Sequence, residues 1–170
     1  MPNEEEAEIL LKCALKKLIS KDLHLIQKNL KEECINHRLA VYLEEGIKNS
    51  NLDFRIDVEY DKSIDEKKKE CLNGKPMRPD IIIHERGHNE KNILAIEAKK
   101  GYIEKHDREK IKDLLDCYEY DYGCLISYFP ERDYLKYIFL KRESPETCFI
   151  STRKWEKLEK RTPEDFNSST

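Results

Sequence analysis

Two carboxylates and a lysine, Asp80, Glu97 and Lys99, stand at the outer ends of two neighbouring apolar segments. Asp80 precedes the segment IIIH, and the segment ILAIEAKK contains Glu97 and Lys99 near its end. A tight hairpin places the start of its first strand beside the end of its second. The three residues are therefore expected at one end of one sheet, where they could hold a divalent cation and cleave a phosphodiester bond.

Strand alternation supports a joint site. Glu97 and Lys99 are two residues apart, so they project to the same face of their strand, together with Ala95. On the preceding strand, Asp80 shares a face with Ile82. The pattern predicts that the three polar side chains can reach one ligand.

The residue types indicate Mg²⁺ or Mn²⁺ as the cofactor. Such ions take hard oxygen ligands, commonly one or two carboxylates plus water and substrate phosphate. Asp80 and Glu97 are the expected carboxylate ligands, and the carbonyl of Ala98 could add a neutral oxygen. Lys99 is expected to hold the attacking water or to offset charge on the phosphate.

Hydrophobic periodicity predicts an α/β protein. The expected order is helix, helix, three strands, helix, two strands, helix, with a mixed sheet and helices on both of its faces. A polar loop is expected at 61–75, a turn at 87–89 and a frayed end from Thr162 onward. The expected helices cover residues 4–19, 23–47, 103–118 and 151–160, and the expected strands cover 54–60, 78–84, 93–99, 124–128 and 134–140.

The dipeptide Pro79-Asp80 and the tripeptide Glu97-Ala98-Lys99 resemble the two motifs of the PD-(D/E)xK nuclease superfamily. The resemblance implies a restriction-endonuclease-like fold, with a central mixed sheet of four to five strands flanked by helices. It also implies a single domain over residues 1–170 with a core at about 23–140. The expected enzyme is a Mg/Mn-dependent phosphodiesterase, that is, a hydrolase that acts as an endonuclease.

The same resemblance implies a glutamate on the helix before the first core strand. Glu33 is the best match and shares a helix face with His37, so it is expected to assist as a metal ligand or water-binding group. Glu32 faces away from the apolar stripe of this helix. Residues 103–118 contain no glutamine, which disfavours the recombination-type exonucleases of the superfamily.

Nucleic acid is the expected partner, and the resemblance favours DNA over RNA. A basic cluster follows the motif and could contact phosphates. An ordinary charged helix with acidic partners is an equal alternative. A small enzyme that cuts both strands is expected to form a homodimer. The cluster's members are Lys100, Lys105, Arg108 and Lys110.

Composition limits the partners. The 170-residue chain has a formal net charge of −3, so nucleic acid must be bound by a local patch. No segment is apolar enough for a membrane span and the start is acidic, which predicts a cytoplasmic protein without membrane contact. Six cysteines without a C-x-x-C pair are expected to be reduced thiols.

Two other functions stay open. A Glu-x-Lys on a strand is commonly a solvated ion pair, so the chain could be a catalytically inactive nuclease-fold interaction module. An RNA-processing nuclease on the same fold would keep the site and change the substrate. Metal binding distinguishes the first alternative, and competition between RNA and DNA distinguishes the second.

Overall fold

The computed structural model describes residues 2–50, 52–60, 77–86, 91–132, 134–141, 145–151 and 157–158. Within these ranges the helices are α1 (Glu4–Gln27), α2 (Glu32–Asn49) and α4 (Lys105–Cys117). The strands are β1 (Arg55–Val58), β2 (Ile81–His84), β3 (Asn92–Lys100), β4 (Tyr122–Tyr128), β5 (Tyr134–Lys141), β6 (Pro145–Ser151) and β7 (Lys157–Leu158).

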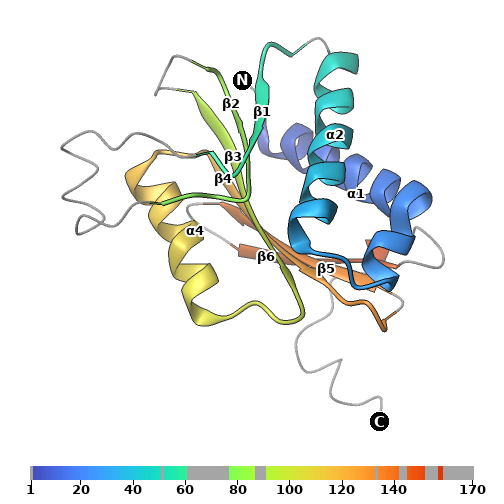
Figure 1. Ribbon diagram of the computed structural model, residues 1–170. Coiled ribbons are helices and arrows are strands. Elements are labelled where there is room, and N and C mark those ends of the chain that lie inside the picture. The colour runs from blue at the N-terminus through green and yellow to red at the C-terminus, as the bar shows by residue number, and fades with distance from the viewer. Residues whose placement is uncertain are drawn as a thin grey trace.

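All described strands belong to one mixed sheet (Figure 1). Its spatial order follows the chain from β1 to β7, and β3–β4 is the parallel pair among antiparallel neighbours. A parallel pair needs a crossover connection, and α4 supplies it. The predicted mixed α/β sheet is confirmed, and β6 and β7 extend it beyond the five strands expected.

Helices cover both faces of the sheet (Figure 1). Alternate residues of each strand point to opposite faces of the sheet. Ile81 and Ile96 pack in the core shared with α1 and α2, whereas Ile82 and Ala95 pack in the core shared with α4. Asp80, Glu97 and Lys99 have the parity of the α4 face. The catalytic candidates therefore lie between the sheet and a single helix.

The first helix is longer than predicted. The expected break near residue 20 is a kink at Asp22 (φ −129°) inside α1, and the chain stays helical to Gln27. The true end is set by Asn29 in the left-handed region (φ 53°), with the Leu30 amide donating to the Leu25 carbonyl. This is a Schellman closure, which Asn tolerates. None of the described helices could cross a membrane.

The helix predicted over 151–160 is wrong in the part that the structure describes. Ser151 ends β6 opposite Tyr134, and Lys157 pairs with Ile150 in β7. The run Thr147-Cys148-Phe149-Ile150 favours a strand, and pairing with β5 outweighs local helix preference. The predicted loop at 61–75, the turn at 87–89 and the end from Thr162 lie outside the described residues.

Among the cysteines that the structure describes, Cys117 departs from expectation. Cys13 and Cys34 are exposed free thiols, as predicted. Cys117, the last residue of α4, forms a disulfide. The prediction of reduced thiols is therefore wrong for Cys117.

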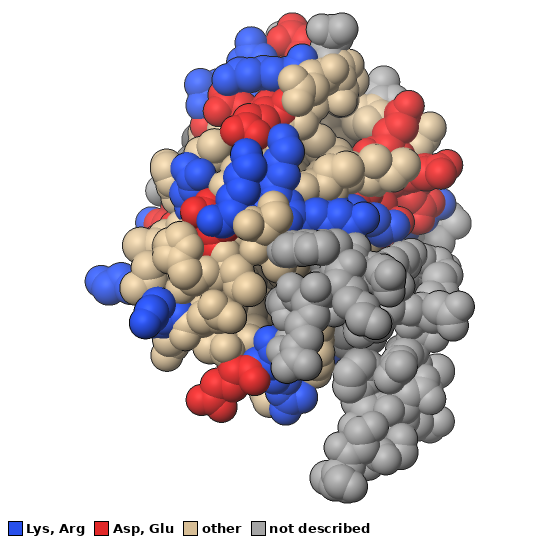
Figure 2. Space-filling view, turned by 90° about the vertical axis from the view of Figure 1, so that its right-hand side faces the viewer, with Lys and Arg blue, Asp and Glu red and all other residues tan. Residues whose placement is uncertain are grey.

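Charge is mixed over the face formed by α1 and α2. Figure 2 shows Lys and Arg side chains interspersed with Asp and Glu on this side. Ion pairs join Lys17 to Glu45 and Arg38 to Asp22 across the two helices. Pairing of this kind leaves no extended field of one sign on the face in view.

Gly123 lets α4 approach the sheet, and a larger residue there should loosen the site. A Cβ at this position would lie 2.6 Å from Cγ2 of Ile111, a β-branched side chain with little rotamer freedom. Gly123→Ala should therefore lower the free energy of unfolding by about 1–3 kcal/mol, measured by urea denaturation.

Gly46→Ala is the matched control. Its Cβ would meet only the end of the Leu10 side chain, which is partly exposed and can move. Alanine is also the better helix former in α2, so this variant should stay within about 1 kcal/mol of wild type. Equal destabilisation by both changes would contradict the assigned role of Gly123.

Candidate active site

The hairpin of β2 and β3 places two carboxylates opposite each other. Ile81 pairs with Ile96, so Asp80 lies across from Glu97 at the open end of the hairpin. Oδ2 of Asp80 accepts a hydrogen bond from the Ala98 amide at 2.8 Å. The Asp80 backbone is also near enough to the Glu97 carboxylate to lower its pKa slightly. The Asp80 carboxylate is therefore held by the backbone of the neighbouring strand.

Glu97 is nearly buried, with 7% of its surface exposed. Burial and then the nearby Asp80 carboxylate raise its pKa to about 7, against the attraction of Lys110. Nζ of Lys110 lies 2.6 Å from Oε1 of Glu97, close enough for an ion pair. The contact lacks regular hydrogen-bond geometry, however, so this buried oxygen keeps no hydrogen bond.

Asp80 is half-buried beside it. Burial raises the pKa of Asp80, and the hydrogen bond from Ala98 and the charge of Lys110 partly offset that effect. Two carboxylates with raised pKa values therefore lie together at one poorly solvated end of the sheet. A divalent cation would relieve their desolvation and their mutual repulsion together.

Lys99 projects to the same face as Glu97, as predicted, but pairs elsewhere. Its Nζ lies 3.0 Å from Glu104 and 3.5 Å from Asp107. Glu104 caps α4 and its amide binds the Asp107 carboxylate at 2.8 Å in a capping box. The bond with Glu104 is the main cause of a raised Lys99 pKa, so the ammonium stays charged at the edge of the site.

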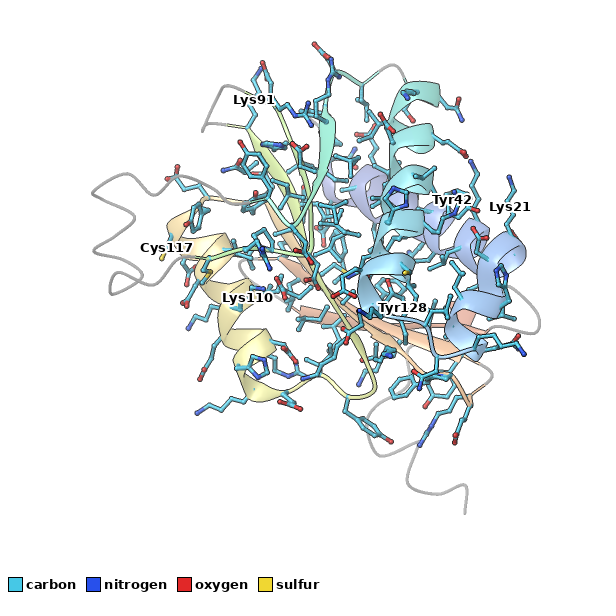
Figure 3. The ribbon with its side chains drawn as sticks, viewed as in Figure 1. Lys21, Tyr42, Lys91, Lys110, Cys117 and Tyr128 are labelled. Carbon is cyan, nitrogen blue, oxygen red and sulfur yellow. The ribbon has the colours of Figure 1, made fainter. Side chains whose placement is uncertain are left out.

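Lys110 faces the sheet from α4 (Figure 3), because its ammonium contacts buried Glu97. The sequence placed it among phosphate-binding residues. Of the others, Lys100 has its ammonium 3.4 Å from the Asn29 carbonyl, and Lys105 pairs with Glu109 on an open helix face. Arg108 lies beyond the carboxylate pair, beside a separate hollow. The four residues do not form one cluster.

Glu32, and not Glu33, lies next to the carboxylate pair. Its side chain is half-buried and lies close enough to the Lys100 backbone for that backbone to lower its pKa, so the start of α2 lies beside the end of β3. Burial is the main cause of its raised pKa, and Asp80 adds to it. Glu33 is exposed. The apolar stripe of α2 favoured Glu33 over Glu32 in the sequence. The stripe does not show that Glu32 is the first residue of α2, whose end abuts the sheet.

Two hollows meet at this point. The inner one has a volume of about 180 Å³, and an outer one of about 430 Å³ shares Glu32 and Asp80 with it. Glu33 and Lys100 border only the outer hollow. The inner one can hold several waters, which suits a hydrated cation and a phosphate group. Its lining residues are Glu32, Asp80, Glu97, Ala98, Lys99, Ile103, His106 and Asp107.

The donor set fits a loosely held hard cation. Among the described residues, no group of three or more His, Cys, Asp or Glu side chains is gathered closely enough to form a complete metal cage. Mg²⁺ is commonly bound through one or two carboxylates, with water and substrate supplying the rest. Asp80 and Glu97, whose Oε1 accepts no regular hydrogen bond and contacts only the Lys110 ammonium among the described contacts, match that requirement.

Sequence reasoning missed one residue of the site and did not foresee the contact that another makes. Asp107 is buried beside Lys99 and binds His106 at 2.9 Å, and Lys110 provides the counter-charge of Glu97. Glu104 and Asp107 form a capping box at the start of α4, but Glu is not among the residues favoured at the N-cap, so the spacing gave only a weak sequence signal. No local signal marks Lys110, because its contact depends on how α4 docks.

Comparisons with known proteins give distant likenesses. No family model and no curated protein sequence matches the chain. The Holliday junction resolvase Hjc from Archaeoglobus fulgidus is 12% identical over 64% of this chain and 83% of its own, with a TM-score of 0.31. A structure titled SSO0001 is 20% identical, with a TM-score of 0.34; the alignment covers 78% of this chain but only 64% of that one.

The molecule's own topology therefore defines its class. Three antiparallel strands, a crossover helix and a parallel fourth strand follow a helix that packs on the opposite face. This is the α/β, restriction-endonuclease-like architecture expected from the sequence. The carboxylate pair lies at the end of its second and third strands.

Neutralising Glu97 should stabilise the metal-free protein at alkaline pH. A folded-state pKa of about 7, above the ordinary 4.5, means that folding favours the protonated acid. Stability from this group is full below pH 4.5 and is lost as pH rises to about 7. Glu97→Gln should therefore gain about 3 kcal/mol over wild type at pH 8, and little at pH 4.5, in urea denaturation with EDTA.

Glu44→Gln is the control, because Glu44 is 54% exposed in an i,i+4 pair with Lys48. Its stability curve should run parallel to that of wild type across the same pH range. A Glu97→Gln protein no more stable than wild type at pH 8 would show that Glu97 is not held in the environment described.

Proposed function

We propose that this protein is a metal-dependent nuclease that hydrolyses phosphodiester bonds in nucleic acid, with DNA the favoured substrate. One observation carries the proposal. Asp80 and Glu97 face each other in a partly enclosed hollow, and both have raised pKa values. Paired, poorly solvated carboxylates are costly for a fold to keep and suit a cation that binds together with phosphate.

Each residue has a proposed part. Asp80 and Glu97 would hold Mg²⁺ or Mn²⁺, with the Ala98 carbonyl as a further oxygen ligand. When bound, the metal lowers the pKa of a water and neutralises charge on the phosphate. Lys99, charged and next to the hollow, offsets negative charge on the phosphate or holds the attacking water.

The acidic partners of Lys99 have a consequence for its role. Glu104 and Asp107 hold the ammonium at the N-terminal end of α4, at the border of the hollow. An ammonium fixed in this way can meet a phosphate oxygen without first being ordered. Its acidic partners also weaken the attraction of anions when no substrate is present, so productive binding depends on the metal as well.

Cleavage assays with matched lysine variants test the activity. Wild type with Mn²⁺ should cut at least one member of a panel of linear, circular, branched and single-stranded DNA and RNA. Lys99→Ala should lose about 100-fold or more in rate, because it removes a charge from the transition state. Lys112→Ala, an exposed lysine on α4, should keep the wild-type rate. Loss of activity in both variants would contradict a specific role for Lys99.

Metal binding can be measured without turnover. Mn²⁺ should raise the melting temperature of wild type, and Asp80→Ala should abolish that shift. An interaction module without a metal site would show no shift in either protein. RNA cut in preference to DNA would instead establish the alternative substrate.

Glu32 and Glu33 form a natural pair of variants. We propose Glu32 as the helix carboxylate of the site, since it adjoins Asp80 in both hollows, whereas Glu33 borders only the outer one. Glu32→Gln should weaken Mn²⁺ binding and slow cleavage about tenfold, and Glu33→Gln should change neither. The opposite ranking would establish the sequence-based choice of Glu33.

A further inference from the structure

Three aromatic rings and an arginine gather beyond the end of β3. Tyr102 contacts Phe129 edge-on, with ring centroids 5.3 Å apart, and Phe129 contacts Tyr134 at 5.6 Å. The guanidinium of Arg132 lies 5.4 Å from the centre of the Phe129 ring and 5.9 Å from that of Tyr102. These four residues are called the aromatic platform below.

The platform is ordered although it is open to solvent. Tyr102 has 68% of its surface exposed, the largest fraction among the exposed large hydrophobic residues described. Its hydroxyl nevertheless accepts a hydrogen bond from Nη2 of Arg132 at 2.9 Å, and Nη1 of Arg132 bonds the Tyr134 hydroxyl at 3.0 Å. An exposed ring fixed in this way has lost part of its rotamer entropy before any ligand binds.

Arg132 keeps its charge available. Its guanidinium donates hydrogen bonds to two phenols, and within the part of the chain that the structure describes no carboxylate forms an ion pair with it. Most other cations near the site do have acidic partners, as Lys99 and Lys110 show. An arginine with aromatic partners and no acid is suited to an anionic, planar ligand.

A short stretch of chain joins the platform to the carboxylate pair. Tyr102 is followed by Ile103, which lines the inner hollow with Asp80 and Glu97. The Gly101 amide, at a positive φ of 92°, bonds the Tyr128 carbonyl at 2.9 Å and anchors this turn to the end of β4. Tyr102 is five positions after Glu97 along the chain, a span of at most about 17 Å, or a few nucleotides.

We infer that the aromatic platform stacks an unpaired base of the nucleic acid, a few nucleotides from the phosphodiester bond that is cut. The inference rests on the proposed nuclease function and specifies its substrate class. Bases inside a continuous duplex already stack on each other, so only an unpaired or terminal base can offer its face to Tyr102. Arg132 can stack on the same nucleotide or contact its phosphate.

The substrate is therefore nucleic acid with a single-stranded segment beside the cut, such as a flap, a gap, a branch or a single strand. Aromatic stacking tolerates any base, so the platform selects for strand structure and not for sequence. A blunt, fully paired duplex would engage the carboxylate site without this contact.

Binding of a fluorescent base tests the platform directly. Full-length wild type in EDTA should quench 2-aminopurine in a single-stranded oligonucleotide, and should quench it far less in the matching blunt duplex. Tyr102→Ala should bind the single strand about tenfold more weakly and lose the quenching. Tyr102→Trp, which restores a ring, should recover both. DNA and RNA versions of the oligonucleotide show which sugar is preferred.

Ile9→Ala is the matched control, because Ile9 is another exposed apolar residue (49%), on α1, outside the platform. It should bind like wild type. Equal binding and quenching by wild type and Tyr102→Ala would overturn the inference, as would the absence of any quenching by wild type.

Cleavage separates this inference from the nuclease proposal. If wild type cuts nucleic acid and Tyr102→Ala has the same KM and kcat on gapped, branched and blunt substrates, the nuclease proposal stands and the platform is wrong. If wild type cuts nothing but shows quenching that depends on Tyr102, the platform stands and hydrolysis is wrong. If both proposals hold, Tyr102→Ala should have a raised KM on substrates that contain a single-stranded segment and an unchanged KM on blunt duplex.

Discussion

Two like charges in a poorly solvated place are the constraint on which this structure depends. Asp80 and Glu97 face each other across the end of a hairpin, where burial raises the pKa of both. The Ala98 amide donates a hydrogen bond to the Asp80 carboxylate, and α4 places Lys110 beside Glu97. These contacts lower the cost of the pair without removing it, since Oε1 of Glu97 keeps no regular hydrogen bond.

The same constraint explains the packing around the site. Lys110 reaches Glu97 only if α4 lies close to the sheet, and Gly123 gives Ile111 the room for that approach. On the other face, Glu32 at the start of α2 lies near the Lys100 backbone and its pKa is raised by burial, so a third carboxylate with a raised pKa marks the end of β3. The core residues of the two faces thus position acids whose own energetics oppose folding.

The strands could be predicted from the sequence better than the docking of the helices. Alternation along β3 correctly put Glu97 and Lys99 on one face, and the hairpin correctly put Asp80 opposite Glu97, because both are local rules of strand geometry. Glu32 was ranked below Glu33, and Lys110 was expected to contact phosphate, because the position of each depends on where a helix end or a helix face meets the sheet. Their own helices carry no signal of that meeting, which is set by tertiary packing.

The two lysines of the site differ in what a bound cation would do to them. Lys110 is the counter-charge of Glu97, so a metal ion on that carboxylate must compete with an ammonium already 2.6 Å away, and the affinity for metal is lowered accordingly. Lys99 pairs with Glu104 and Asp107 and loses nothing when Glu97 binds metal. Lys110 therefore suits the role of stabilising the site before the metal enters. Lys99 is the lysine whose charge stays in place while a phosphate is bound, and this supports its assignment to the chemistry.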